Sequence, residues 1–263
     1  MLEKTAAVAD VVRFERDKDV AILTMAYAPH NLLSSVLARG IVAGLDNAKK
    51  AGSRAVVLCS GLRHFSAGAD LNLFENNGEV FRKDFDAVGL LQAMESHPAP
   101  IIASVHGVAL GGGLELALAC DLIVAAGSSK MGLVEATLGL HPLMGGIQRM
   151  AQRVGVARAK EVVMLARRYD AATFERWGVV NRVVPDAQLR EITMTLAHEL
   201  AHGATVAHGA TKQLFNRYLN EGMAASDAAM ASVQEPIWAS RDLASGISTF
   251  KEKGPGAARF TGH

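Results

Sequence analysis

The sequence contains little cysteine and carries almost no net charge. Only two of its 263 residues are cysteines, Cys59 and Cys120, and both stand inside apolar runs, so we expect reduced, buried thiols and a reducing compartment. The formal net charge of +1 excludes a global field that would attract nucleic acid or an anionic membrane surface. The sequence therefore predicts neither nucleic acid nor a membrane as a partner.

Long hydrophobic runs are missing as well. Nowhere do about 18 uncharged apolar residues stand together, and the charged N-terminal segment lacks the apolar stretch of a signal peptide. Half of the residues are nevertheless hydrophobic, which is enough for a sizeable core in one large or two modest domains. These observations predict a globular protein of the cytoplasm.

Strand and helix patterns alternate along most of the chain. The runs VVRFE and VAILTM predict a hairpin, a helical pattern follows from Leu33 to Ala48, and RAVVLCS, IIASV and DLIVAA predict further strands. Beyond about residue 185 only helical patterns remain, around 186–202, 206–221 and 226–243, before a Gly/Pro-rich tail. This order predicts an α/β body followed by an all-helical C-terminal part.

A carboxylate in an apolar helix is the first feature that suggests chemistry. Glu115 lies in the run LELALAC, directly after the glycines at 111–113. A buried carboxylate needs a partner or a task, and glycines at a helix start leave backbone N–H groups open as an oxyanion site. Alternatively, the glycines only allow close packing and Glu115 reaches solvent. The triplet alone does not decide between these two interpretations.

Two other features are weak when each is taken alone. Glu135 follows the apolar run KMGLV, but a carboxylate in the first turn of a helix, favoured by the helix dipole, is a simpler explanation for it. The stretch from Phe65 to Asp70, FSAGAD, follows a predicted strand, and its small residues would let a ligand approach the backbone closely. Only the order and spacing of these features along the chain, taken together, can therefore indicate a function.

Together the three features resemble the crotonase superfamily, which contains the enoyl-CoA hydratases and isomerases. FSAGADL matches the first fingerprint of the family, and HGVALGGGLELALACD matches the second, with Glu135 twenty residues after Glu115 as in the hydratases. PLMGGIQRM and TFERWGVVNRVVP match two further stretches, so the resemblance covers essentially the whole chain. It implies a crotonase-like spiral of repeated ββα units over 1–195 and a helical region over 196–263 that covers CoA and contacts other subunits.

The resemblance also implies the residues of a site. Glu115 and Glu135 would be the acid/base pair, and the backbone N–H groups of Ala69 and Gly112 would form an oxyanion hole for a thioester carbonyl. Arg63 and Lys253 are candidates for contacts with the CoA phosphates. The positions implied to contact substrate or CoA are Ala67, Gly68, Ala69, Asp70, Leu71, Gly111, Leu143 and Phe250, the last in the same or a neighbouring subunit.

The implied reaction is the addition of water to a trans-2-enoyl-CoA to give a 3-hydroxyacyl-CoA, a reaction of fatty acid β-oxidation, without a metal or a redox cofactor. The alternatives are a Δ3,Δ2-enoyl-CoA isomerase, another acyl-CoA enolate reaction, or a non-catalytic CoA-binding subunit. Isomerases of the superfamily usually keep one of the two glutamates, so the presence of both favours a hydratase. The resemblance also implies a homo-oligomer, either a trimer or a dimer of trimers. Leu143 stands where many hydratases have glycine, which predicts a bulkier wall near the water.

A zinc-site pattern competes with this interpretation. His198 and His202 are spaced as in zinc peptidases, and His208 lies at the spacing of a third ligand. At about 100° per residue, however, the apolar stripe through Leu189, Ile192, Leu196 and Leu200 lies nearly opposite the first two histidines. A zinc ion there would face solvent, so we expect an ordinary helix and no metal site.

Overall fold

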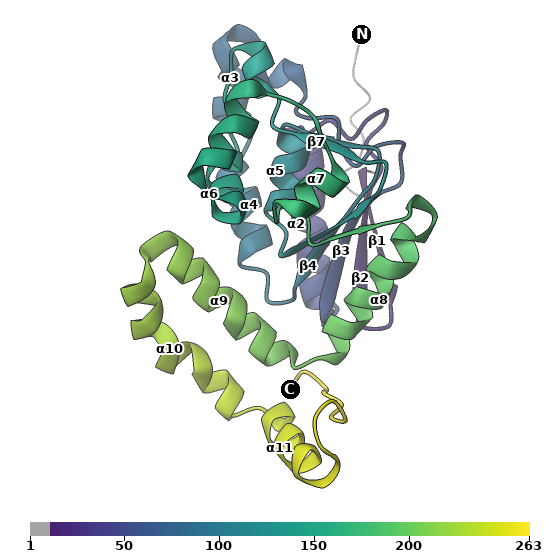
Figure 1. Ribbon diagram of the computed structural model, residues 1–263, viewed down its shortest axis with the longest axis vertical. Helices are drawn as coiled ribbons and strands as arrows, with labels where there is room; N and C mark the ends of the chain where they lie inside the picture. Colours follow the sequence, from purple (N-terminus) through teal and green to yellow (C-terminus); the bar gives the residue numbers. More distant parts are fainter. Residues whose placement is uncertain (1–10) are drawn as a thin grey trace.

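The computed structural model describes residues 11–263, and its largest element is a six-stranded sheet (Figure 1). β1 (Val12–Asp17) and β2 (Val20–Met25) form the expected antiparallel hairpin. The strands after β2 are all parallel to it and follow in the order β3 (Ala55–Ser60), β4 (Ile101–Val105), β6 (Leu122–Ala126) and β9 (Arg182–Val184). The inner strands are buried on both faces, which explains their continuous apolar sequences.

A second, three-stranded sheet consists of β5 (Val108–Leu110), β7 (Lys130–Gly132) and β8 (Tyr169–Asp170). The chain passes from β4 directly to β5, and from β6 directly to β7, so each turn adds one strand to each sheet. Helix α5 (Gly112–Leu118) follows β5, and the 3₁₀ helix η2 (Glu135–Leu138) follows β7. This repetition confirms the predicted α/β fold of the crotonase type.

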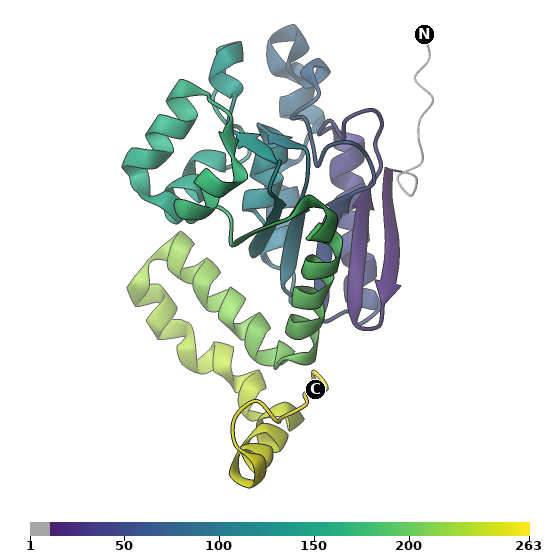
Figure 2. The same ribbon diagram turned by 45° about the vertical axis from the view of Figure 1, so that its right-hand side comes forward.

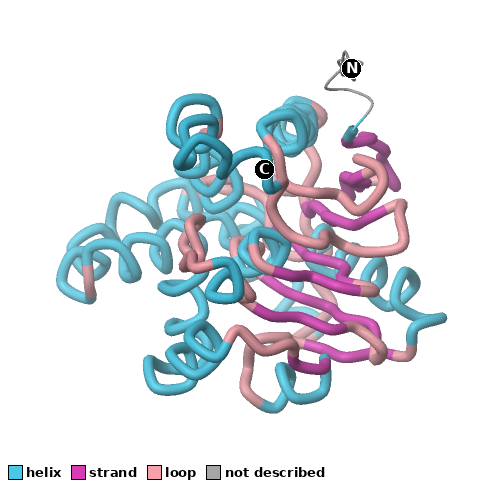
Figure 3. Tube along the Cα trace, turned by 90° about the horizontal axis from the view of Figure 1, so that it is seen from above, coloured by secondary structure: helices cyan, strands magenta, loops and turns pink. Residues whose placement is uncertain are grey.

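Helices cover both faces of the large sheet (Figures 2 and 3). On one face, α2 (Ser35–Lys50), α4 (Ala87–Glu95) and α5 share the main core with alternate strand residues such as Val56 and Leu58. On the other face, α8 (Leu189–His202) packs on the intervening residues, among them Val57 and Ile102. The two-residue period of the strands thus divides the apolar side chains between two cores.

Five further elements complete the body of the protein. The 3₁₀ helix η1 (Leu71–Phe74) and α3 (Glu75–Asp84) follow the FSAGAD stretch. Helices α6 (Gly146–Leu165) and α7 (Ala171–Arg176) lie between β7 and β9 in the chain, and the short η3 (Asp186–Gln188) precedes α8. None of the helices within residues 11–263 is both long and apolar enough to span a bilayer.

The C-terminal helices extend away from the sheets (Figure 1). They are α9 (Thr205–Glu221), α10 (Met223–Trp238) and α11 (Arg241–Lys253). The prediction of a single helix over 226–243 is wrong, because α10 ends at Trp238 and a new helix begins at Arg241. The Ser240 side chain accepts a hydrogen bond from the Leu243 N–H and caps α11. The predicted boundary after residue 195 falls inside α8, and the division of the chain there stays a prediction.

Candidate active site

A cavity of about 280 Å³ lies beside the residues that follow β5 and β7. Among the residues 11–263 that line it, Glu115 and Glu135 alone have polar side chains. The other lining residues are glycines or apolar: Leu32, Leu33, Ala67, Gly68, Ala69, Leu71, Leu73, Phe74, Phe81, Phe85, Gly111, Gly112, Val134, Leu138, Leu140, Leu143 and Met144. The structure therefore brings the two predicted glutamates together in an apolar site.

Glu115 is held by the backbone of a distant loop. It projects from α5, is 2% exposed, and its Oε1 accepts hydrogen bonds from the N–H groups of Met144 and Gly146, each 2.8 Å long. Burial raises the pKa of Glu115, whereas the two N–H donors stabilise the carboxylate and lower the pKa. The interpretation in which Glu115 reaches solvent is wrong.

Gly146 is required by this arrangement. A Cβ atom at Gly146 would lie 2.8 Å from Cγ and 2.9 Å from Oε1 of Glu115. The two N–H donors belong to the stretch PLMGGIQRM, and sequence reasoning used that stretch only as part of the resemblance. The paired glycines were the available signal, but they do not say which side chain their backbone would contact.

Glu135 has the opposite environment. It begins η2, and both carboxylate oxygens are buried without a hydrogen-bond partner in the described part of the chain. Burial raises the pKa of Glu135 to about 7, and the nearby charge of Glu115 adds to the shift. Gly111 makes room for this side chain, since its φ is +50° and a Cβ there would lie 3.1 Å from Glu135 Oε1. One glutamate is thus bonded to two donors and the other to none.

Two backbone N–H groups lie open at the same cavity. A Cβ on Gly112, the first residue of α5, would lie 3.7 Å from the nitrogen of Ala69, so the two predicted donors are neighbours. Neither N–H donates a hydrogen bond to another group within residues 11–263. Leu33 holds the loop in place, because its N–H donates to the Gly68 carbonyl and its carbonyl accepts from the Asp70 N–H.

A buried asparagine supports the same loop. Asn31 is fully buried, and its Nδ2 donates to the Phe65 carbonyl at 3.1 Å and to Ser60 Oγ at 2.8 Å. Ser66 Oγ in turn donates to the Asn31 carbonyl at 2.7 Å. Sequence reasoning did not identify this residue, because a lone asparagine in a loop gives no sign of the three segments that it joins.

The remaining predicted positions divide into two groups. Ala67, Gly68, Leu71, Gly111 and Leu143 line the cavity with the glutamates. Asp70 does not line it; its carboxylate accepts a hydrogen bond from the Asn72 N–H at 3.0 Å and caps η1.

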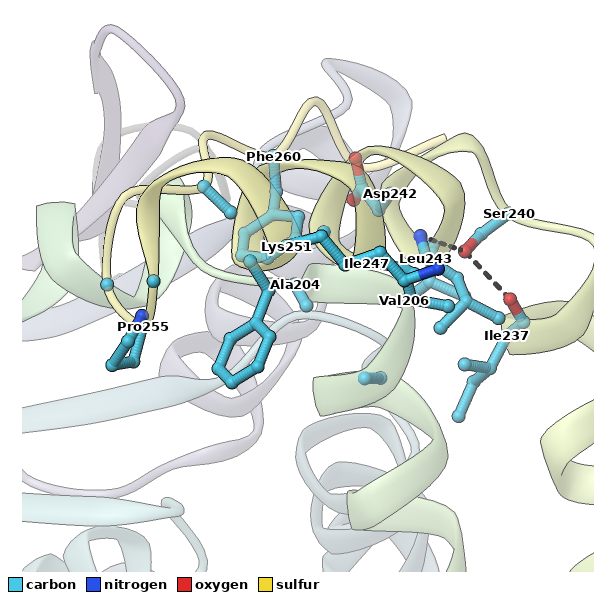
Figure 4. Close-up of a pocket in the computed structure, with 16 residues that line it drawn as sticks. Ala204, Val206, Ile237, Ser240, Asp242, Leu243, Ile247, Lys251, Pro255 and Phe260 are labelled. Carbon is cyan, nitrogen blue, oxygen red and sulfur yellow. Dashed lines mark hydrogen bonds between the residues drawn. The ribbon is translucent and has the colours of Figure 1, made fainter.

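Phe250 lies outside the glutamate cavity of its own chain. It lines a separate hollow of about 500 Å³ formed by residues of α9, α10 and α11 and by the C-terminal tail (Figure 4). Lys253 ends α11, and Arg63 lines a third hollow together with His106 and Arg190. Within one chain the structure thus leaves these three predicted contacts away from the glutamates.

The histidines of the zinc-like pattern take part in other contacts. His198 Nε2 lies 3.0 Å from Asp17 Oδ2 of the hairpin, and its ring stacks on that of His202. The apolar stripe of α8, with Leu189, faces the sheet as predicted. In residues 11–263 no cluster of three or more His, Cys, Asp or Glu side chains could hold a metal ion.

Comparison with known proteins identifies the family that this chain resembles. The family model described as enoyl-CoA hydratase/isomerase matches residues 15–261. The chain is 34% identical over 253 residues to a probable enoyl-CoA hydratase of Mycobacterium bovis, covering 93% of this chain and 96% of that one. It is 36% identical over 213 residues to a carnitinyl-CoA dehydratase of Escherichia coli, covering 71% and 81% of the two chains. The crystal structure of an enoyl-CoA hydratase from Bacillus anthracis superposes with a TM-score of 0.87 at 30% identity, covering 96% of this chain and all of that one.

Proposed function

Because the chain belongs to the enoyl-CoA hydratase/isomerase family, we propose that it adds water to a trans-2-enoyl-CoA to give a 3-hydroxyacyl-CoA. One observation carries the proposal: two glutamates in one apolar cavity have environments that favour different protonation states. General acid and general base work on the same substrate requires such a pair. The acyl-CoA thioester is the substrate, and the proposed reaction uses no metal or redox cofactor.

The open N–H groups of Ala69 and Gly112 bind the thioester carbonyl oxygen. Negative charge accumulates on this oxygen when water attacks C3, since the electrons of the C2–C3 double bond move towards the carbonyl. Two fixed donors in an apolar cavity stabilise that charge without reorganisation of solvent. Because Gly112 is the first residue of α5, its N–H belongs to the positive end of that helix.

The glutamates then divide the proton transfers. Glu115, whose Oε1 is held by two N–H groups, is the carboxylate that orients water and accepts its proton. Glu135, whose unpartnered carboxyl has its pKa raised to about 7, is the acid that protonates C2. After one turnover Glu115 carries the proton taken from water and Glu135 has lost its proton to C2, and proton exchange with solvent restores the starting states.

The test uses the isosteric variants Glu115→Gln and Glu135→Gln with crotonyl-CoA. Each variant should fold, bind acyl-CoA, and lose about 10²–10⁴ in the rate of hydration. Exchange of the C2 proton with deuterated water should be lost mainly in Glu135→Gln. Glu199→Gln is a matched control, because Glu199 is exposed on α8 and does not line the cavity.

A Δ3,Δ2-isomerase is the alternative on the same scaffold. It moves a proton without adding water, so it would depend on Glu135 far more than on Glu115. A protein that shifts a 3-enoyl double bond much faster than it hydrates crotonyl-CoA would be an isomerase. Normal hydration by Glu115→Gln would reject the role of Glu115 as the general base.

We also propose a homo-oligomer, a trimer or a dimer of trimers, in a cytoplasmic setting. Large apolar side chains are exposed on the C-terminal helices, among them Phe215, Trp238, Ile247 and Phe250, and contacts with other copies would cover them. The two free thiols, Cys59 and Cys120, fit a reducing compartment. Light scattering of the purified protein tests the assembly, and a stable, active monomer would reject it.

A further inference from the structure

The peptide unit that joins Gly145 to Gly146 is bound at both ends by side chains. Its N–H donates to Glu115 Oε1 at 2.8 Å, and its carbonyl oxygen accepts a hydrogen bond from Arg149 Nη1 at 3.3 Å. We propose, on the basis of the hydratase function above, that Arg149 is a positioning residue that acts through this peptide unit to hold Glu115 in place and in its ionised form. Arg149 itself does not line the glutamate cavity.

The turn at these two glycines has no room for a side chain on either face. Gly145 has a φ of +75°, and a Cβ atom there would overlap the guanidinium of Arg149. A Cβ atom on Gly146 would overlap Glu115, as described above. The guanidinium and the carboxylate therefore pack against neighbouring glycines of one short turn, and a shift of either side chain would move the peptide unit between them.

Glu95, the last residue of α4, fixes the direction of the guanidinium. Its Oε1 accepts hydrogen bonds from Arg149 Nε, at 2.9 Å, and from Arg149 Nη2, while Nη1 points to the Gly145 carbonyl. The Arg149 side chain is 15% exposed. A planar group bound through all three of its nitrogens keeps one orientation, which a flexible ammonium would not. The ion pair thus supports the turn from the side opposite to Glu115.

Helix α9 supports Glu95 in turn. Asn216 Nδ2 donates to the backbone carbonyl of Glu95 at 2.8 Å, and both residues border a hollow of about 170 Å³ together with Arg149. The hollow is otherwise lined by uncharged side chains, those of Gln148, Gln152, Leu219 and Asn220. Among the described residues at this hollow, Glu95 is therefore the one counter-charge of the guanidinium.

The arrangement favours the ionised form of Glu115 in two ways. A donor bound to the carbonyl end of a peptide unit polarises the unit and strengthens the hydrogen bond that its N–H makes. In addition, burial raises the pKa of Glu115, whereas the two backbone donors and the positive charge of Arg149 lower it. The other titratable groups on the cavity side are Glu135 and His141, and the charge of His141 acts on Glu135. Arg149 is thus the cation that opposes the effect of burial on Glu115.

The experiment measures the pH dependence of kcat/KM for crotonyl-CoA in Arg149→Met. Methionine keeps most of the length of the side chain without its charge or its donors. The acidic limb, which Glu115 determines, should move to higher pH by about one pH unit, and the alkaline limb should move less. Below the acidic limb this shift corresponds to a loss of about tenfold in kcat/KM. Arg149→Lys keeps the charge and should leave the limb closer to its wild-type position. An unmoved acidic limb in folded Arg149→Met would overturn the proposal.

A change in Glu95 should have the opposite sign. Glu95→Gln keeps an acceptor for the guanidinium but removes the negative charge that offsets it, so the acidic limb should move to lower pH. A shift to higher pH in both Glu95→Gln and Arg149→Met would mean that the limb follows the packing of the pair and not its charge. That result would also overturn the proposal.

Arg153→Met is the matched control for a general loss of structure. Arg153 lies one turn further along α6, is also partly buried, and donates to the carbonyls of Cys120 and Val179 instead of to the turn. Urea denaturation should show that both arginine variants are destabilised, whereas the acidic limb should move only in Arg149→Met. An equal shift of the limb in Arg153→Met would reject a specific role of Arg149.

Infrared spectroscopy separates this inference from the hydratase proposal, because it follows Glu115 without turnover. The band of the protonated carboxyl that is missing from Glu115→Gln should titrate at higher pH in Arg149→Met than in the wild type. If no enoyl-CoA is hydrated but the band behaves in this way, the hydratase proposal fails and the role of Arg149 stands. If crotonyl-CoA is hydrated and neither the limb nor the band moves, the role of Arg149 alone is rejected.

Discussion

The rate of hydration should decline as the pH rises through about 7, because Glu135 must be protonated to act as the acid. Its folded-state pKa of about 7 means that roughly half of the free protein carries the proton at that pH and about a tenth one pH unit higher. Glu115 must be ionised, and its raised pKa determines the decline on the acidic side. We therefore expect a bell-shaped dependence of kcat/KM, whose two apparent values belong to the coupled pair.

The assay measures kcat/KM for an enoyl-CoA across the pH range in buffers of constant ionic strength. Glu135→Gln should lose about 10²–10⁴ in rate and should also lose the alkaline limb, since glutamine does not ionise. Glu115→Gln should instead lose the acidic limb. An alkaline limb that persists in Glu135→Gln, or a wild-type rate constant up to pH about 9, would refute the assignment of Glu135.

The free energy of unfolding gives an independent test of the raised pKa of Glu135. The folded-state pKa of Glu135 lies above its ordinary value of 4.5, so the neutral form contributes stability that is fully present below that value and is lost as the pH rises through about 7. The free energy of unfolding of wild type relative to Glu135→Gln should therefore fall between pH about 5 and about 8. Urea denaturation of the two proteins at both pH values measures this difference, and a constant difference would contradict the burial of the carboxyl.

Three further predictions concern the backbone and the histidines. Gly146→Ala should cost about 1–3 kcal/mol of stability and most of the activity, since its Cβ would overlap Glu115, whereas Gly127→Ala, with no atom nearer than 3.6 Å, is the matched control for denaturation and kinetics. Gly112→Pro should retain the helix, because proline is favoured at a first helical position, and should lose about 10²–10³ in rate through the missing N–H; wild-type turnover would show that Gly112 is not a donor. Activity should survive a chelator, because His198 pairs with a hairpin aspartate, and loss of one zinc per chain together with activity would reverse this expectation.

The sequence predicted the two glutamates of the cavity better than their supports. Each glutamate taken alone allowed a simpler explanation, and Glu115 and Glu135 were singled out by the order and spacing of the motifs that resemble the crotonase superfamily. The donors to Glu115 come from Met144 and Gly146, and a backbone N–H of a distant loop leaves no mark on residue type. Long-range backbone contacts of this kind require the three-dimensional fold.

The C-terminal part shows a second limit of sequence patterns. The helical pattern continues across residues 239 and 240, so periodicity alone predicted one helix where the structure has two. Ser240 was the only local sign of a new helix start, and serine is common in other contexts as well. The separate position of Phe250 likewise follows from the direction in which α11 extends, which no residue pattern specifies.

The register of β5 and β7 determines how Glu115 and Glu135 are placed relative to each other. β5 and β7 are adjacent parallel strands with Leu110 opposite Gly132, and Glu115 and Glu135 each follow their strand by a few residues. The interval between the two carboxylates along the chain is therefore one complete circuit of the spiral. Adding or removing a residue in that circuit would displace one carboxylate by a strand position unless a connection between the elements, such as residues 119–121 or the turn between β6 and β7, absorbed the change. Loops elsewhere in the chain, such as those that flank α3 and the C-terminal helices, could be lengthened without altering the interval between these two glutamates.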